Sequence, residues 1–259
     1  MAHLVLGYPT LEKSIRTAET YIAAGVEILE LQIPFSHPTA DGPVITAACR
    51  LAVEQQRVTV PDCLAAIRRL RDRYPAQEIM VMSYVNRVFV YGFERFQQEM
   101  RNLGIRHLII PDLPVDAPVP GVQERSHEVK PLPFTGVLLP GGAVLVPVLA
   151  ANVTDSRLEQ LLKAGYDFFY LMSDFKITGS TFSLHPRLEQ LVARIRSANP
   201  AARVGIGFGI DTPAQVKAVL ALADYAIVGS ALIREKEKGG LDHYLEYLKN
   251  AIRPATLAN

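Results

Sequence analysis

Short apolar runs alternate with longer amphipathic segments along most of the chain. The apolar runs have the length of strands, and the segments after them repeat their apolar residues at helical spacing. Strands are predicted over residues 3–7, 26–33, 79–84, 105–110, 143–149, 167–172, 203–207 and 225–228. Helices are predicted over residues 11–24, 44–56, 61–74, 92–103, 156–164, 185–198 and 211–223, and again from 231 onward.

This succession of strand–helix units predicts an α/β fold, a (β/α)₈ TIM barrel in which residues 1–259 form a single domain. An open doubly wound sheet is the alternative. It is disfavoured because no Gly-x-Gly-x-x-Gly motif follows the first predicted strand. In a barrel, the residues that carry chemistry lie at the C-terminal ends of the strands and in the loops that follow them.

The regular alternation breaks between residues 111 and 142. Prolines and glycines recur there, and no helical period is visible where a fourth crossover helix is expected. We expect this segment to be irregular and mobile.

Composition narrows the function classes. A net charge of +1 without a basic run gives no electrostatic footprint for nucleic acid or an anionic membrane. The chain has no membrane-length apolar run and no signal-peptide pattern, so a cytoplasmic protein is expected. Cys49 and Cys63 lack the spacing of metal ligands or of a disulfide framework, so no metal is expected. Small-molecule chemistry is the remaining class.

Two carboxylates follow one another at the end of the second predicted strand. Two-residue alternation puts Glu30 on the polar face of this strand, and Asp41 lies in the proline-restrained loop after it. An enclosed carboxyl keeps its proton near neutral pH while a solvated one stays ionised, so such a pair suits acid–base chemistry. The alternative is that Glu30 pairs with a lysine or arginine and that Asp41 is a turn residue.

Glycine-rich loops close the last two predicted strands. Gly209 follows one of them, Gly229 and Ser230 follow the other, and both loops lead directly into helices, where unpaired backbone N–H groups bind anions. Gly179, after the sixth strand, offers further donors. Tight packing alone would explain one such glycine, but two loops in these places favour a phosphate site.

Tyr170 shares a strand face with Phe168 and Met172, so its hydroxyl is expected in the barrel mouth, with a role as core filler as the alternative. The histidines, His3 among them, lack the spacing of a triad or a metal site, and no chemistry is assigned to them. No serine or cysteine nucleophile with a neighbouring base is visible.

From the second predicted strand into its loop the sequence reads Glu30-Leu-x-x-Pro-Phe-Ser-x-Pro-x-Ala-Asp41-Gly-Pro. By this motif, its most specific match, the chain resembles the α subunit of tryptophan synthase. Supporting matches are Ser83-Tyr84-x-Asn86, Pro111-Asp112-Leu113-Pro114, Tyr170 with Thr178-Gly179, Gly207-Phe208-Gly209 and Gly229-Ser230. The resemblance covers most of the chain and weakens between residues 115 and 142.

The resemblance implies a carbon–carbon lyase of tryptophan biosynthesis, which cleaves indole-3-glycerol phosphate to indole and glyceraldehyde 3-phosphate without a cofactor of its own. Glu30 would protonate indole C3 and then act as a base, and Asp41 would accept the ring N–H. Tyr170 would line the reacting region. The substrate phosphate would be held by Gly179, Gly209, Gly229 and Ser230.

The sequence departs from the family pattern at three places. His37 replaces the usual Asp, Gln32 the usual Gly, and Asp174-Phe175-Lys176 a loop with Arg, a small residue and Gly. The family's second loop faces a β subunit in an αββα complex, so His37 weighs against that partnership, and pyridoxal phosphate is expected only in such a partner. The helix that usually precedes the first strand is also absent from this sequence.

These departures keep two alternatives to a working lyase open. One is a diverged, non-catalytic phosphate-binding subunit that regulates a β-type partner, which the altered loop at 174–176 favours. The other is a stand-alone lyase that acts on a related aryl-glycerol phosphate, which Gln32 and His37 favour.

Overall fold

The computed structural model describes residues 1–113, 143–173, 184 and 186–250. Most of the segment expected to be irregular lies outside these residues, as do Gly179 and the 174–176 loop. No helix in the described ranges is both long enough and apolar enough to cross a membrane.

Parallel strands form the centre of the molecule. Their bounds are β1 (Ala2–Val5), β2 (Ile28–Gln32), β3 (Glu78–Met82), β4 (His107–Ile109), β5 (Val144–Leu145), β6 (Val148–Ala150), β7 (Phe168–Met172), β8 (Arg203–Gly207) and β9 (Tyr225–Ile227). Strands β1 to β5 pair in chain order in one sheet, and β6 to β9 pair in chain order in a second. Every predicted strand is therefore present.

The two sheets close into one barrel. β5 and β6 together occupy the fifth position, divided at Pro147, which has no N–H to donate. The Val146 N–H donates to the Leu108 carbonyl on one side, and the Pro147 carbonyl accepts from the Tyr170 N–H on the other. At the opposite seam the His3 N–H donates to the Val228 carbonyl at 2.9 Å. The predicted TIM barrel is confirmed.

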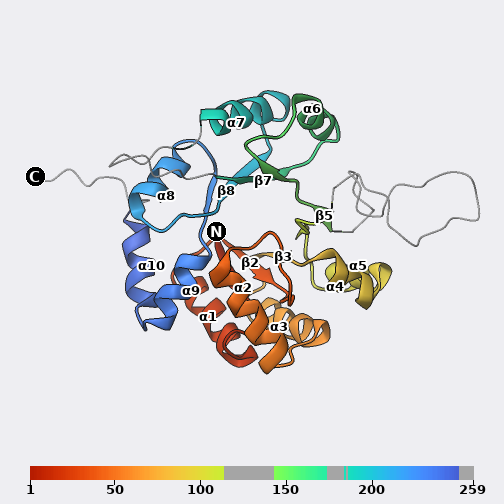
Figure 1. Ribbon diagram of the computed structural model, residues 1–259, viewed down its shortest axis with the longest axis vertical. Coiled ribbons are helices and arrows are strands. Elements are labelled where there is room, and N and C mark those ends of the chain that lie inside the picture. Colours follow the sequence, from red (N-terminus) through yellow and green to blue (C-terminus); the bar gives the residue numbers. More distant parts are fainter. Residues whose placement is uncertain (114–142, 174–183, 185, 251–259) are drawn as a thin grey trace, which may run out of the picture.

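Helices surround the strands (Figure 1). Their bounds are α1 (Leu11–Ala23), α2 (Pro43–Arg50), the π-helix η1 (Leu51–Gln55), α3 (Val60–Arg73), α4 (Val85–Tyr91), α5 (Phe93–Asn102), α6 (Asp155–Lys163), α7 (Pro186–Ala198), α8 (Pro213–Leu220), α9 (Ser230–Glu237) and α10 (Leu241–Lys249). Several begin at a threonine whose side chain accepts a backbone N–H, as Thr10 and Thr154 do for α1 and α6.

Helix α4 differs from the expectation. The sequence pattern predicts no helix between β3 and residue 92, because this stretch is apolar without an amphipathic period and has no capping side chain of its own. A distant residue stabilises its start, since the Asp112 carboxylate accepts the Val85 N–H at 2.9 Å. A second difference is that the helix predicted over 44–56 changes to π geometry at Leu51.

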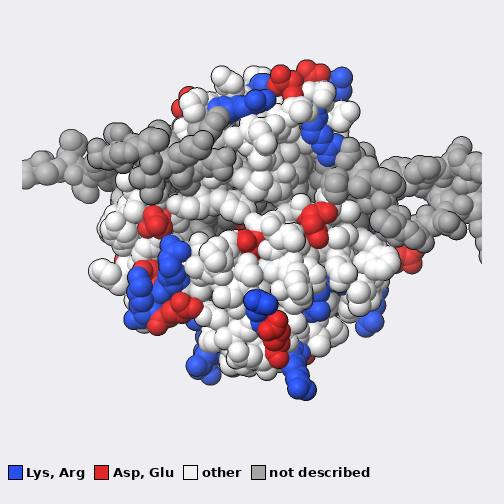
Figure 2. Space-filling model, viewed as in Figure 1, with Lys and Arg blue, Asp and Glu red and all other residues white. Residues whose placement is uncertain are grey.

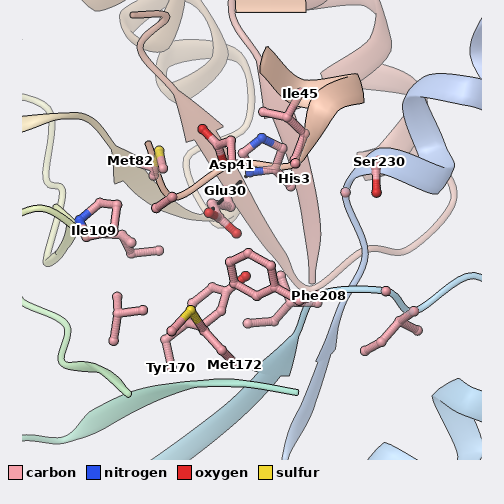
Figure 3. A pocket seen from close by; sticks show the side chains of 18 residues that line it. His3, Glu30, Asp41, Ile45, Met82, Ile109, Tyr170, Met172, Phe208 and Ser230 are labelled. Carbon is pink, nitrogen blue, oxygen red and sulfur yellow. Dashed lines mark ion pairs between the residues drawn. The ribbon is translucent and has the colours of Figure 1, made fainter. Parts of the chain in front are cut away.

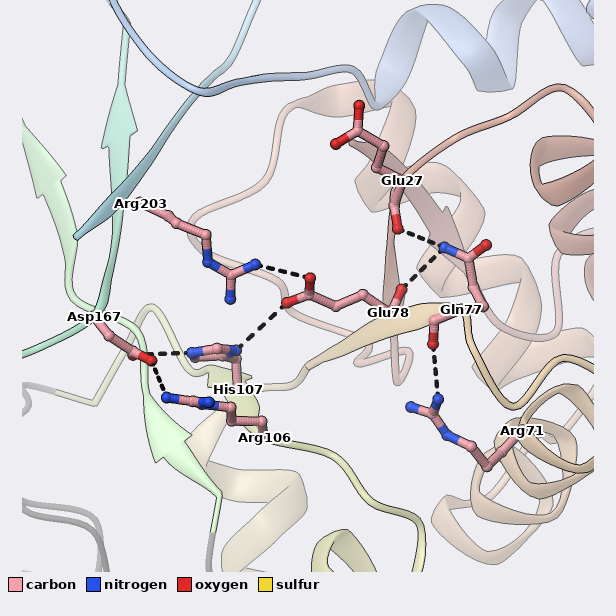
Figure 4. A network of polar contacts seen from close by, with 8 residues as sticks. All are labelled: Glu27, Arg71, Gln77, Glu78, Arg106, His107, Asp167 and Arg203. Atoms are coloured by element: carbon pink, nitrogen blue, oxygen red, sulfur yellow. Dashed lines mark hydrogen bonds and ion pairs between the residues drawn. The ribbon is translucent and has the colours of Figure 1, made fainter. Parts of the chain in front are cut away.

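Charged side chains form a network of ion pairs at the N-terminal ends of the strands (Figure 4). Arg203 pairs with Glu78 at 2.8 Å, and His107 lies 3.0 Å from Asp167 through Nε2 and 3.8 Å from Glu78 through Nδ1. Arg106 also pairs with Asp167. These five residues, which we call the floor network, tie the starts of β3, β4, β7 and β8 together.

Candidate active site

A cavity of about 170 Å³ lies at the C-terminal ends of the strands. The face in Figure 2 is hollowed near its middle, and most charged side chains on it lie towards the periphery. Every predicted site residue except Gly179, which is outside the described residues, lines this cavity: Glu30, Asp41, Tyr170, Gly209, Gly229 and Ser230. The fold therefore brings together residues that are up to 200 positions apart in the chain (Ser230 less Glu30).

Glu30 lies in the middle of β2, with 3% of its surface exposed. Strand alternation turns Leu29 and Leu31 into the main apolar core and leaves Glu30 facing the cavity. Its Oε1 atom is 3.2 Å from the Nδ1 atom of His3. Its Oε2 atom is buried without a hydrogen-bond partner among the described residues, so this oxygen is available to a ligand.

The partner of Glu30 is thus His3, and not the lysine or arginine of the alternative interpretation. The parallel register of β1 and β2 places His3 directly beside Glu30. His3 also lines the cavity, which corrects the expectation that no histidine belongs to the site. The signal that could have identified it is this strand pairing, since the two residues lie on neighbouring strands with the same inward face.

Asp41 is held by hydrogen bonds to one of its oxygens. Gln32 Nε2 donates to Asp41 Oδ2 at 2.7 Å, and the Tyr84 hydroxyl donates to the same atom at 2.8 Å. The Tyr84 hydroxyl in turn accepts the Ala40 N–H at 3.1 Å, which fixes the loop. Burial raises the pKa of Asp41, while His3, Gln32 and Tyr84 oppose the rise. Asp41 is therefore a positioned cavity residue, and Tyr84 is a partner that side-chain spacing alone did not reveal.

Tyr170 faces the two carboxylates from β7, on the opposite wall (Figure 3). A Cβ atom at Gly207 would overlap the Tyr170 hydroxyl, so the glycine on β8 makes room for it. Burial, with the charges of Glu30 and Asp41, raises the pKa of Tyr170 well above its usual value, so the phenol stays protonated. Its hydroxyl makes no hydrogen bond to any residue within the described ranges.

Apolar side chains complete the walls of the cavity. They come from five different strands and provide surfaces that suit a flat aromatic ring: Met82, Ile109, Val148, Met172 and Ile227.

The loops after β8 and β9 form the rim. Phe208 and Gly209 both have left-handed backbone, with φ of 75° and 74°. The Ser173 hydroxyl holds this turn by donating to the Gly207 carbonyl at 2.6 Å. Helix α9 begins after Gly229 without a side-chain cap, so its first N–H groups and its positive dipole end are available to an anion. Helix α8 differs, because Gln215 already accepts the N–H groups of Asp211 and Thr212.

Within the described ranges, no group of three or more histidine, cysteine, aspartate or glutamate side chains could hold a metal ion. Cys49 and Cys63 are buried thiols without a disulfide.

Comparison with known proteins gives a consistent result. The family model described as tryptophan synthase alpha chain matches residues 1–255. The tryptophan synthase alpha chain of Syntrophotalea carbinolica is 32% identical over 241 residues, which cover 93% of this chain and 89% of that protein. That of Escherichia coli O1:K1 is 32% identical over 259 residues, with 98% and 91% covered.

Solved structures agree. A structure of Mycobacterium tuberculosis tryptophan synthase aligns with a TM-score of 0.77 at 27% identity, over 98% of this chain and 92% of the other. Tryptophan synthase subunit alpha of Campylobacter jejuni aligns with a TM-score of 0.73 at 26% identity, over 95% and 92%.

Proposed function

The chain belongs to the tryptophan synthase alpha chain family, which cleaves indole-3-glycerol phosphate in tryptophan biosynthesis, and we propose that the cavity around Glu30 and Asp41 is where it does so. The reaction is a retro-aldol cleavage to indole and glyceraldehyde 3-phosphate by a carbon–carbon lyase. The observation that carries the proposal is the buried Glu30 carboxyl, which keeps one oxygen unpaired among the described residues and faces the same cavity as Asp41.

Glu30 performs both proton transfers. It donates a proton to indole C3, which makes the ring a leaving group, and then as a carboxylate it removes the proton of the glycerol hydroxyl while the carbon–carbon bond breaks. The bond electrons return to the ring, and Glu30 recovers the proton that it gave. The unpaired Oε2 atom is the oxygen suited to both transfers.

Asp41 stabilises the ring during these steps. Protonation at C3 puts positive character on the ring nitrogen, and a fixed carboxylate that accepts the ring N–H lowers the energy of this state. Both of its hydrogen bonds to described residues end on Oδ2. Oδ1 is therefore the oxygen suited to the substrate.

The glycine-rich rim anchors the substrate phosphate. We assign this role to Gly209, Gly229 and Ser230, with Gly179 as a further donor predicted from the sequence. The start of α9 supports it through available N–H groups and the helix dipole. Binding energy from the phosphate orients the reacting carbons against Glu30. Tyr170 lines the opposite wall and donates to the substrate.

Release of indole from indole-3-glycerol phosphate tests this proposal. The wild-type protein is expected to release indole, and Glu30→Gln to lower kcat by about 10²–10⁴-fold because the amide cannot transfer protons. Glu27→Gln is the matched control, since it removes the same charge from an exposed position just before β2. Equal rates for Glu30→Gln and wild type would reject the role of Glu30, and no indole from the wild type would reject the function.

The same assay should also be run with a β-type partner present. Alpha chains of this family associate with beta chains, and the exposed Phe89 and Val90 of α4 offer an apolar surface for such a contact. A regulatory subunit without activity would stimulate the partner and release no indole of its own. A lyase is expected to release indole both with and without the β-type partner.

A further inference from the structure

Two side chains that the proposed reaction does not use lie against its two carboxylates. His3 Nδ1 is 3.2 Å from Glu30 Oε1, and Gln32 Nε2 donates to Asp41 Oδ2 at 2.7 Å. Figure 3 shows His3 beside both Glu30 and Asp41 on one wall of the cavity. His3 is 4% exposed and Gln32 is fully buried. Burying these two polar side chains costs desolvation free energy that two apolar side chains would not cost.

The remaining polar atoms of this group are unpaired. His3 Nε2 and Gln32 Oε1 are both buried, and neither makes a hydrogen bond within the described ranges. Burial lowers the pKa of His3, but the charge and hydrogen bond of Glu30, together with Asp41 and Gln32, outweigh it and raise the pKa above its usual value. An imidazolium at this position therefore lies within the field of both carboxylates.

The orientation of the imidazole is restrained by its surroundings. A Cβ atom at Gly229 would lie 3.3 Å from His3 Cβ and 3.5 Å from His3 Cγ, so the β9–α9 segment packs closely against the ring. The titratable groups of described residues around it are Glu30 on β2, Asp41 in the next loop, Tyr170 across the cavity and the N-terminal amine of Met1.

We propose that His3 is a positioning residue for the cleavage reaction, which pairs with the Glu30 carboxylate whenever Glu30 is ionised, while Gln32 holds Asp41 in place. The inference rests on the proposed function. Between its two proton transfers Glu30 is an anion in a buried site, and the imidazolium stabilises it there. Glu30 recovers from the hydroxyl the proton that it gave to C3, so the protons on His3 are unchanged over the cycle.

The pH profile of indole release by His3 variants tests this role. His3→Phe keeps a flat aromatic ring and removes the donor, and we expect a fall in kcat of about tenfold with little change in KM. We also expect the pH profile of kcat to move to higher pH, because the ionised carboxylate in the cavity loses its cation. His3→Gln restores a neutral donor and should recover part of kcat. His243→Gln, at an exposed position of α10, is the control.

A second measurement does not depend on turnover or on the folding of His3→Phe. In nitrogen-15 NMR spectra of the imidazoles, the His3 signal, assigned by its loss in His3→Gln, should titrate at lower pH in Glu30→Gln than in the wild type. The wild type could release indole while Glu30→Gln leaves the His3 titration unchanged and His3→Phe leaves the pH profile unchanged. That result would overturn the inference about His3 and leave the proposed function intact. If the wild type releases no indole, the proposed function fails first.

Discussion

Two buried histidines in this barrel lie beside carboxylates, one at each end of the strands, and their surroundings differ. His107 in the floor network pairs with Asp167 and approaches Glu78, and Arg106 and Arg203 pair with the same two carboxylates. His3 in the cavity pairs with Glu30 alone, while its own Nε2 atom, one Glu30 oxygen and the Gln32 carbonyl oxygen lack hydrogen-bond partners among the described residues.

This difference separates a stabilising network from a reactive site. In the floor network, each carboxylate has a cation and a histidine within reach, so little hydrogen-bonding capacity is left. In the cavity, buried polar atoms are unpaired, which costs stability unless a ligand satisfies them. The floor network is therefore expected to affect unfolding, and the cavity residues to affect turnover.

After Glu30→Gln, Asp41→Asn should give the largest effect of the substitutions that test this comparison. The neutral amide keeps the shape of the side chain but loses the charge that stabilises the protonated ring, so kcat should fall by about 10²–10³-fold. The free energy of unfolding should change little, because burial already disfavours the charged form of Asp41. Indole release measures the fall in kcat, and urea denaturation measures the free energy of unfolding. Asp155→Asn, on the exposed side of α6, is the control. A loss of stability without a loss of turnover would contradict the assignment.

Asp167→Asn should have an intermediate effect, which is a decrease in the free energy of unfolding. The hydrogen bond from His107, with the charges of His107 and Arg106, lowers the pKa of Asp167 from 3.8 to about 2. A lowered pKa means that the ionised form stabilises the folded state above the unfolded value, and that this stabilisation is lost as pH falls towards 2. Because Asp167 is about one-third exposed, solvent screening reduces the loss at neutral pH to about 1 kcal/mol.

Urea denaturation of this variant between pH 2 and pH 7 measures that loss. The gap between wild type and Asp167→Asn should be constant above about pH 4 and narrow below it. Indole release should be unaffected. A gap that does not depend on pH would show that packing, and not charge, stabilises this end of the barrel.

Tyr170→Phe should have the smallest effect. Its hydroxyl has no partner among the described residues, so removing it leaves none of their polar groups unpaired, and the free energy of unfolding should change by less than about 0.5 kcal/mol. The fall in kcat should stay below about tenfold, because the hydroxyl only adds one hydrogen bond to the substrate. A fall as large as that of Glu30→Gln would identify Tyr170 as a proton donor in its own right.

Strand positions and the barrel were predictable from the sequence because parallel strands buried on both faces leave clear apolar runs. Glu30 stood out as a polar residue inside such a run, and Asp41 as a carboxylate in a restrained loop. The start of α4 was not predictable, since Asp112, which caps it, lies 27 positions away (112 less 85). The division between β5 and β6 follows from Pro147 but depends on which neighbours pair on each side.

His3 escaped prediction for a related reason. A two-residue period tells which face a side chain occupies, but not which residue of the next strand lies beside it. Only the register of β1 against β2 brings His3 to Glu30. Gln32 was recognised as a departure from the family pattern, yet its hydrogen bond to Asp41 depends on how the loop folds back over the strand.

The difference between the cavity and the floor network is tested most directly by comparing two variants, Glu30→Gln and Glu78→Gln. For each, the kcat of indole release is measured at saturating indole-3-glycerol phosphate and at a temperature below the Tm of that variant. Both substitutions replace a carboxylate that lies beside a buried histidine. We expect Glu30→Gln to lose about 10²–10⁴-fold in kcat and Glu78→Gln to retain the wild-type value. Equal losses for the two variants would contradict the assignment of the chemistry to the cavity.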